Sequence, residues 1–327
     1  MQLLAGDIGG TKTRLVLLEQ QSGGNRVVHE ERYPSNQFPG LGPIVTRFLR
    51  EAGGRPGAAC FGIAGPVVER RVQATNLAWV VDQDELRDAL GIPVRLINDF
   101  AAIGHGIPHL KPADVTVLQS GRADEHGVIA YLGAGTGLGQ GFLVWNGDRY
   151  QVHSSEGGHA SFASMDGIED RLAGALRERF GHVSWERLLS GAGLVAIYRF
   201  LSGEDGTPGP ARAEIDAADD PAPVISSHAL AGTDPHCVRA LEVFVSIYGA
   251  QAGNLALTFL ATGGVYVAGG IAPKILARLV DGPFLDAFRS KGRMKALLAR
   301  IPVKVITNTD VGLLGAAAVA GHVSRET

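Results

Sequence analysis

Residues 2–18 read QLLAGDIGGTKTRLVLL and set a pattern that the chain later repeats. An apolar run leads into Gly9-Gly10-Thr11, and a second apolar run follows from Thr13 to Leu18. Two such runs around a glycine turn predict a β-hairpin. Glycines let backbone N–H groups face an anion, and the Thr11 hydroxyl adds a donor. The stretch therefore predicts a hairpin that binds phosphate.

This segment also has the outline of a P-loop, from Gly6 to Lys12 and Thr13. We reject that interpretation because Thr11 stands where the second glycine belongs, and because a strand follows where a P-loop has a helix. Asp7 lies at the end of the first strand, where its carboxylate can hold the water shell of Mg²⁺. The alternative is an ordinary hairpin with a solvated aspartate.

A second stretch echoes the first one. An apolar strand at Gly127–Leu132 leads into GAGTGLG at residues 133–139, and another strand follows at Phe142–Trp145. The glycine spacing differs from the G-x-G-x-x-G of dinucleotide-binding loops. A duplicated fold with one phosphate-binding hairpin in each half would produce this echo.

Composition limits the classes of protein that need consideration. The 327 residues suit two domains rather than one core, and a net charge of -3 without a basic run argues against nucleic acid or acidic membranes as partners. No apolar run has membrane-spanning length, and the N-terminus lacks the pattern of a signal peptide. We expect a cytoplasmic protein in which Cys60 and Cys237 are buried thiols.

Several helices are signalled by their ends. Asp82 predicts the N-cap of a helix over Gln83–Leu90, and Asp234-Pro235 predicts the start of a long core helix that ends at Gly263-Gly264. A last helix is expected at about residues 312–322. The stretch Ser202–Pro223, rich in Gly, Pro, Ala and Asp, predicts a poorly ordered loop without a catalytic role.

Polar residues follow the predicted strands. Asn98 and Asp99 end a buried strand, and ligands usually bind at the carboxyl ends of sheet strands. Asp99 is thus a candidate base for a hydroxyl proton in phosphoryl transfer, although an aspartate here could instead cap a helix. Glu156 and His159 flank two glycines and could hydrogen-bond neighbouring sugar hydroxyls; zinc is a weaker alternative because no cysteine lies near. Glu186 is a further candidate carboxylate, or a surface charge.

The ordered motifs GDIGGT, INDF, GAGTGLG, SEGGH, LLSGAGL, GGVYVAGG and GLLGAA resemble those of bacterial glucokinases in the hexokinase–actin–Hsp70 superfamily. Each motif is weak alone, but seven in order from Leu4 to about Ala320 are specific. The resemblance implies an α/β, two-lobed actin-like ATPase fold, a duplicated ribonuclease H-like fold with an interlobe cleft. The small lobe would span residues 1–110 with helix 312–327, and the large lobe residues 111–311.

The resemblance also implies roles for single residues. The nucleotide would bind two phosphate loops and an adenosine turn that contain Gly6, Asp7, Ile8, Gly9, Gly10, Thr11, Gly133, Gly135, Thr136, Gly137, Gly269 and Gly270. The sugar would bind Asn76, Asn98, Asp99, Glu156, His159 and Glu186. Asp99 would be the catalytic base for the sugar 6-hydroxyl, and Asp7 would hold Mg²⁺ through water.

One departure from the wider family is informative. The related repressor-kinase branch carries a cysteine-rich zinc motif after its Glu-Gly-Gly-His segment, whereas Ala160 to Arg171 contains no cysteine here. That branch also needs an N-terminal DNA-binding helix pair, and the first strand here is expected to start at Gln2. Both features predict a zinc-free glucokinase.

We therefore expect ATP-dependent phosphorylation of glucose to glucose 6-phosphate in glycolysis, with glucose and MgATP as partners and a homodimer by family resemblance. The alternatives are a kinase for mannose or glucosamine, a sugar sensor without turnover, or an actin-like or chaperone ATPase. Asp99 argues against a sensor, since a sensor needs no base. The sugar-binding set argues against the ATPases. ADP or polyphosphate as donor stays open.

Overall fold

The structure is a computed structural model that describes residues 1–21, 24–75, 77–204 and 206–325. It divides into two compact units: the first unit is Met1–Lys111 with Asn308–Thr327, and the second unit is Pro112–Thr307. Each unit contains its own sheet and hydrophobic core. Among the described residues, no helix combines the length and apolar character needed to cross a membrane.

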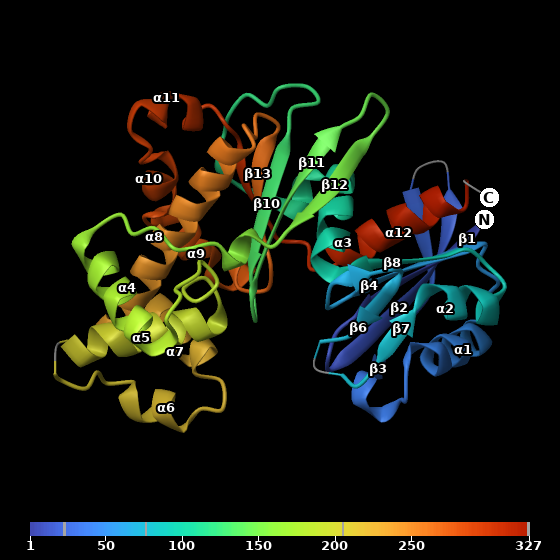
Figure 1. Ribbon diagram of the computed structural model, residues 1–327, viewed down its shortest axis with the longest axis horizontal. Coiled ribbons are helices and arrows are strands. Elements are labelled where there is room, and N and C mark those ends of the chain that lie inside the picture. Colours follow the sequence, from blue (N-terminus) through green and yellow to red (C-terminus); the bar gives the residue numbers. More distant parts are fainter. Residues whose placement is uncertain (22–23, 76, 205, 326–327) are drawn as a thin grey trace. The chain divides into compact units, whose positions relative to one another are not determined.

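The first unit is a five-stranded sheet with helices on both faces. Its elements are β1 (Gln2–Ile8), β2 (Lys12–Gln21), β3 (Gly24–Pro34), α1 (Leu41–Ala52), β4 (Ala58–Ile63), β5 (Val67–Val68), β6 (Arg71–Gln73), β7 (Val80–Asp82), α2 (Gln83–Leu90), β8 (Val94–Asn98), α3 (Asp99–Gly106) and α12 (Val311–Val323). The sheet order is β3-β2-β1-β4-β8, and β5, β6 and β7 form a separate small sheet. Helices α1 and α2 pack on one face and α12 on the other (Figure 1).

The second unit has a six-stranded sheet that packs against a long helix. Its elements are β9 (Val115–Gln119), β10 (Ile129–Ala134), β11 (Leu138–Trp145), β12 (Tyr150–Ser155), η4 (Gly157–His159), α4 (Gly167–Phe180), α5 (Gly191–Glu204), α6 (Arg212–Ala217), α7 (Pro221–Ala231), α8 (Pro235–Thr258), β13 (Gly264–Ala268), η5 (Ala272–Ile275), α9 (Leu276–Asp281), α10 (Phe284–Arg289), α11 (Lys295–Leu298) and β14 (Val303–Ile306). The sheet order is β12-β11-β10-β13-β14-β9. Helix α8 contacts β10 and β13, and α5, α7 and α10 pack around it (Figure 1).

The two sheets repeat one topology, as the echo in the sequence predicted. In the first unit, β1 pairs antiparallel with β2 and parallel with β4. In the second unit, β10 pairs antiparallel with β11 and parallel with β13 in the same way. Both predicted glycine hairpins therefore exist, and each one continues from the central strand of its sheet. The segment after Gly9 runs into a strand, so the rejection of a P-loop is also confirmed.

The helix ends predicted from capping residues agree well with the structure. The Asp82 carboxylate accepts hydrogen bonds from the N–H groups of Asp84 and Glu85, and α2 ends before Gly91 at a φ of 66°. Asp234 caps α8 in the same manner. One boundary was wrong, since α8 ends at Thr258 and not at Gly263, because irregular turns precede β13.

The expected loop at Ser202–Pro223 is wrong in part. Helix α5 continues to Glu204, α6 lies inside the stretch, and α7 begins at Pro221. Ile215 of α6 is buried in the core of the second unit, and the Asp234 carboxylate accepts a hydrogen bond of 2.9 Å from the N–H of Ala211. These tertiary contacts order a segment whose composition alone indicates a loop.

Close helix packing supports the start of α3, where Asn98 and Asp99 lie. Helix α12 packs directly on α3. A Cβ at Gly315 would lie 1.8 Å from the carbonyl oxygen of Ala102, and one at Gly106 would lie 2.2 Å from that of Val311. Only glycine permits this approach, so the two helices form a tightly packed pair behind the candidate base.

Candidate active site

The first candidate site residue, Asp7, lies near the end of β1 with its side chain exposed to solvent. The turn that follows is closed by a hydrogen bond of 2.9 Å from the N–H of Gly9 to the carbonyl of Lys12. Thr11 is exposed within this turn. Gly6, by contrast, is buried within β1, where a Cβ would lie 2.6 Å from the ring of Phe61. Gly6 therefore serves the packing of the sheet.

Asn98 and Asp99 divide two tasks at the start of α3. The N-cap is Asn98, whose side-chain oxygen accepts hydrogen bonds from the N–H groups of Phe100 and Ala101. Its amide nitrogen donates to the carbonyl of Gly65 at 3.0 Å. Asp99 is the first residue of the helix, and one of its oxygens accepts from the Phe100 N–H at 2.8 Å. Because Asn98 provides the cap, the Asp99 carboxylate is not needed for it.

Asp7 and Asp99 belong to one cluster of charged side chains in the first unit. Burial raises the pKa of Asp99, while hydrogen bonds from the Phe100 N–H and from the Asn98 side chain oppose the shift. The pKa of Asp7 is also raised, first by the partial loss of water around its carboxylate and then by the negative charge of Asp99. The Arg14 guanidinium works in the opposite direction on Asp7. Two carboxylates of the first unit are thus coupled electrostatically.

Arg14 lies opposite Asp7 in the β1–β2 pairing. Its guanidinium pairs with Asp310 at 2.5 Å and with Glu30 at 2.7 Å. Asp310 immediately precedes α12, so this ion pair joins the first hairpin to the last helix of the chain. The Arg14–Asp310 pair lowers the pKa of Asp310. The sequence interpretation did not include either residue.

In the second unit, the two glycine turns lie side by side. Residues 135–137 connect β10 to β11, with Thr136 exposed at the tip. Gly269 follows β13 with a φ of +83°, and a Cβ there would lie 2.5 Å from the carbonyl oxygen of Ala134. Apart from the two flanking residues, no atom of the described residues lies within 4 Å of where a Cβ would stand on Gly135 or Gly270. The backbone of both turns is therefore open to a ligand.

The predicted sugar ligands Glu156, His159 and Glu186 converge in the same unit. The His159 imidazole lies 3.8 Å from the carboxylate of Glu156 and 3.8 Å from that of Glu186. The side chains of Glu156 and His159 are 86% and 62% exposed, and that of Glu186 is 32% exposed. The cluster thus presents two carboxylates and an imidazole to solvent, the types of group that bind sugar hydroxyls.

Backbone pairing holds this cluster together. The segments 158–162 and 183–186 run alongside each other, with the Glu186 N–H donating to the carbonyl of Gly158 at 2.9 Å and the Trp185 N–H donating to that of Ala160 at 3.1 Å. Gly158 also packs on the second hairpin, since a Cβ would lie 2.3 Å from the carbonyl oxygen of Leu138. Pairing therefore fixes the segment where the related branch carries its zinc motif.

A buried polar row beneath the cluster was not found from the sequence. The Gln140 carboxamide oxygen would lie 2.5 Å from a Cβ on Gly157, and it accepts a hydrogen bond of 3.4 Å from Gln251 of α8. Gln251 in turn accepts from Asn254 at 3.0 Å. Asn76, the remaining predicted sugar ligand, lies outside the described residues. Among the described residues, no three His, Cys, Asp or Glu side chains are placed so that they could hold one metal ion together.

Comparisons with known proteins identify the family of this chain. A family profile described as Glucokinase matches residues 4–323. A glucokinase from Nostoc sp. is 47% identical over 338 residues, which cover 98% of this chain and 99% of the relative.

Two solved structures extend the likeness to three dimensions. The structure of a glucokinase from an Antarctic psychrotroph has a TM-score of 0.88 and 32% identity, and covers 98% of this chain and 99% of its own. A ROK family glucokinase from Streptomyces griseus, solved in complex with glucose and AMPPNP, has a TM-score of 0.65 at 22% identity, and covers 98% and 100%. At that identity the likeness concerns the fold alone. The chain is therefore an enzyme with the actin-like ATPase fold that belongs to the glucokinase family.

Proposed function

We propose that this chain transfers the γ-phosphoryl group of ATP to the 6-hydroxyl of glucose, with Asp99 as the general base. We assign the base to Asp99 because Asn98 caps α3. The Asp99 carboxylate is therefore available to accept a proton. Hydroxyl oxygen becomes a competent nucleophile as a nearby carboxylate takes its proton. Membership of the glucokinase family supports the reaction and the hexose.

The family resemblance supports candidate hexose ligands in each unit. From the first unit we assign Asn98 and Asp99, and from the second unit the cluster of Glu156, His159 and Glu186. A carboxylate accepts hydrogen bonds from two adjacent hydroxyls, while an imidazole can donate to one hydroxyl and accept from another. Such a set orients the ring, and orientation is a large part of the rate enhancement in phosphoryl transfer.

The nucleotide would bind the two open turns of the second unit, at Gly133–Gly139 and at Gly269-Gly270, and the hairpin turn that ends with Thr11. Backbone N–H groups in such turns are suited to phosphate oxygens. The space around the Cβ positions of Gly135 and Gly270, where the described residues other than the chain neighbours place no atom within 4 Å, is room that a phosphate or adenosine would fill.

Magnesium fits the chemistry of Asp7. This carboxylate faces solvent and has a raised pKa caused in part by the Asp99 charge, so a nearby cation would relieve the repulsion. A single carboxylate suits Mg²⁺, which keeps most of its waters when it binds nucleotide phosphates. Bound there through water, the ion would neutralise phosphate charge.

We also infer a cytoplasmic reaction and a homodimer. Both cysteines, Cys60 and Cys237, are buried free thiols, which is compatible with a reducing compartment. The homodimer rests on family resemblance, and light scattering coupled to size-exclusion chromatography tests it directly.

A coupled assay of the purified protein tests the function. The donors would be ATP, ADP and polyphosphate, and the acceptors glucose, mannose and glucosamine. We expect the highest kcat/KM with glucose and ATP in the presence of Mg²⁺. A higher kcat/KM with mannose or glucosamine would replace the proposed hexose, and binding of glucose without turnover would make the chain a sensor.

A further inference from the structure

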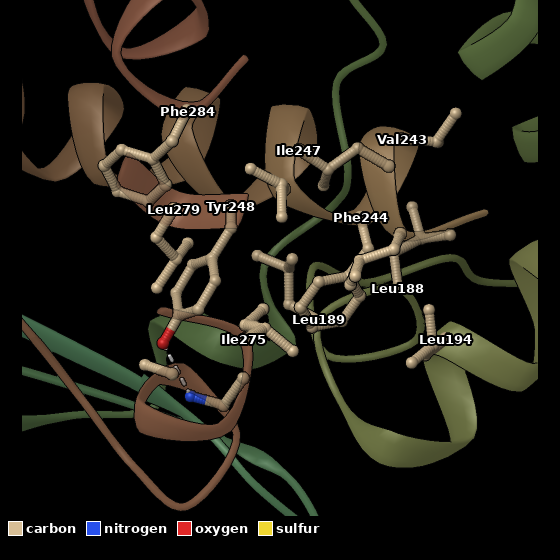
Figure 2. Close-up of a cluster of buried hydrophobic side chains, with 14 of the residues drawn as sticks. Leu188, Leu189, Leu194, Val243, Phe244, Ile247, Tyr248, Ile275, Leu279 and Phe284 are labelled. Carbon is tan, nitrogen blue, oxygen red and sulfur yellow. Dashed lines mark hydrogen bonds between the residues drawn. The ribbon is translucent and has the colours of Figure 1, made fainter. Parts of the chain in front are cut away.

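Tyr248 is a fully buried side chain of α8 that points out of the helical core toward the sheet. None of its surface is exposed, and its ring makes edge contacts with Phe244 and Phe284, each with ring centres 5.9 Å apart. A Cβ at the next residue, Gly249, would lie 2.0 Å from the carbonyl oxygen of Phe284. Helix α10 therefore lies close to α8 and fixes the Tyr248 ring in one direction (Figure 2).

The Tyr248 hydroxyl makes two hydrogen bonds to backbone groups on different strands. It accepts from the N–H of Ala134, the last residue of β10, at 2.9 Å, the bond drawn as a dashed line in Figure 2. It donates to the carbonyl of Ala268, the last residue of β13, at 3.2 Å. Burial raises the pKa of Tyr248, so the hydroxyl keeps the proton that it donates.

This position is the end of the ladder between two parallel strands. The last paired residues of β10 and β13 are Gly133 and Ala268. Beyond them the strands turn away into the two glycine turns, and the turn at Gly269 passes close to the carbonyl oxygen of Ala134, which accepts from the Ile271 N–H at 3.2 Å. The hydroxyl thus satisfies two buried backbone groups at the point where the ladder stops.

We propose that Tyr248 is a positioning residue for the nucleotide, because its hydroxyl fixes the spacing between the Gly133–Gly139 turn and the Gly269-Gly270 turn. The inference rests on the proposed assignment of these turns to ATP. Tyr248 itself touches no substrate in this scheme, and it acts through Ala134 and Ala268. Removing the hydroxyl would leave these two groups without that partner and allow the turns to shift.

The test compares two tyrosine substitutions in the same hydrophobic core. Tyr248→Phe removes one oxygen and both hydrogen bonds. Tyr198→Phe is the matched control, since Tyr198 is equally buried and its hydroxyl atom has no hydrogen-bond partner within the described part of the structure. We expect Tyr248→Phe to raise the KM for ATP about tenfold, as small misplacements of bound reactants do, with the glucose KM within about twofold of wild type. Tyr198→Phe should leave both constants unchanged.

Thr136→Ala separates failure of this inference from failure of the nucleotide assignment. If Thr136→Ala raises the KM for ATP and Tyr248→Phe does not, Tyr248 is a structural residue only and the inference is overturned. If neither variant changes the KM for ATP, the assignment of the turns fails as well. If Tyr248→Phe raises only the KM for glucose, the inference that Tyr248 positions the nucleotide is also overturned.

Hydrogen exchange supplies a measurement that does not depend on a stable variant. In the wild-type protein the Ala134 amide should exchange as slowly as the ladder amides of β10, and far more slowly than the amide of Thr136. An Ala134 amide that exchanges as fast as that of Thr136 would mean that the hydroxyl bond is absent, and the proposal would fail. In a folded Tyr248→Phe protein this amide should lose its protection.

Discussion

The carboxylate of Glu186 accepts a hydrogen bond of 2.9 Å from the backbone N–H of Leu138, the first residue of β11. Its second oxygen faces the His159 imidazole. A Cβ at Gly137 would lie 2.5 Å from the Glu186 carboxylate, so the turn requires glycine beside it. One side chain thus links the candidate sugar ligands to the turn assigned to the nucleotide.

The first prediction follows from this link. Glu186→Ala should raise the KM for glucose and for ATP each by about tenfold, since losing a bond to a buried partner costs about 1–3 kcal/mol. Glu186→Gln keeps an oxygen acceptor for Leu138, so its ATP KM should stay near wild type while its glucose KM rises. Initial rates over a grid of both substrates measure this, with the exposed Glu178→Ala on α4 as control. Equal behaviour of the Ala and Gln variants would exclude the structural link.

Asp99→Asn should bind glucose and lose turnover. Asparagine has almost the same shape but cannot accept the proton, so kcat should fall about 10²–10⁴-fold. Calorimetry should still detect glucose binding. The control is Asp82→Asn, the same exchange at the start of α2, where the aspartate caps the helix and pairs with Arg71. A variant at position 99 that retains more than about a third of the wild-type kcat would assign the base elsewhere.

The pH dependence should report the Asp99 environment. Its raised pKa means that the base becomes protonated as pH falls through a value above the ordinary aspartate pKa of about 3.9, so the acid limb of kcat/KM should lie above that value. The raised pKa also makes stability depend on pH. The folded state binds this proton more tightly than the unfolded state, so Asp99 contributes favourably to the free energy of unfolding at low pH. That contribution is lost as pH rises through the folded-state pKa. Asp99→Asn should therefore melt at a higher temperature than wild type at pH 7.

A prediction for Asn98 concerns the acid limb of the kcat/KM profile, which we assign to Asp99. Its side-chain hydrogen bond lowers the pKa of Asp99. Asn98→Ala should accordingly move the acid limb to higher pH and also weaken glucose binding. A pH–rate profile of the variant measures the shift, and a limb that moves to lower pH would contradict the assignment of the limb to Asp99.

His159→Ala should weaken glucose binding more than it slows chemistry. The imidazole lies between two carboxylates, and the Glu186 carboxylate stands between it and the Gly133–Gly139 turn assigned to the nucleotide. Loss of one hydrogen bond to a hydroxyl of bound glucose should cost about 1–3 kcal/mol, or about tenfold to a hundredfold in the glucose KM, with a smaller change in kcat. The control is His153→Ala on β12, where the ring stacks on Phe142. An ATP KM that rises as much as the glucose KM would place His159 in the nucleotide site.

Zinc should not be needed. The segment after His159 has no cysteine, and backbone pairing with residues 183–185 already fixes it. Elemental analysis of the purified protein should find less than about a tenth of an equivalent of zinc. Stoichiometric zinc that leaves together with activity on chelation would show that the segment has a metal site after all.

Local signals in the sequence were sufficient for much of the fold. The caps at Asp82 and Asp234 and the two glycine hairpins are features that a few neighbouring residues determine, and they were predicted correctly. The segment around α6 was not, because its order comes from Ile215 and from a contact with the Asp234 carboxylate. Composition does not report such tertiary contacts.

The sequence likewise indicates some residues of the candidate site and not others. Glycines and carboxylates next to strand ends indicate where ligands bind, and the structure brings Glu156, His159 and Glu186 together. The supporting residues carry no such local sign. Arg14 meets Asp310 from the opposite end of the chain, and Tyr248 looks in the sequence like one more apolar residue of a core helix. Their roles depend on which distant segments the fold makes neighbours.

Helix α12 covers an apolar face of the first sheet whose strands are translated long before it. β1 and β4 are translated early, yet their Leu3, Ala5 and Cys60 side chains are covered by α12, which is translated after the strands of both sheets. Until the final helix arrives, this apolar face stays open to chaperones and to aggregation. The helix that bears Asp99 also lacks its glycine-packed neighbour during that time. A chain that lacks α12 would therefore carry Asp99, the proposed base, on a helix without its packing partner.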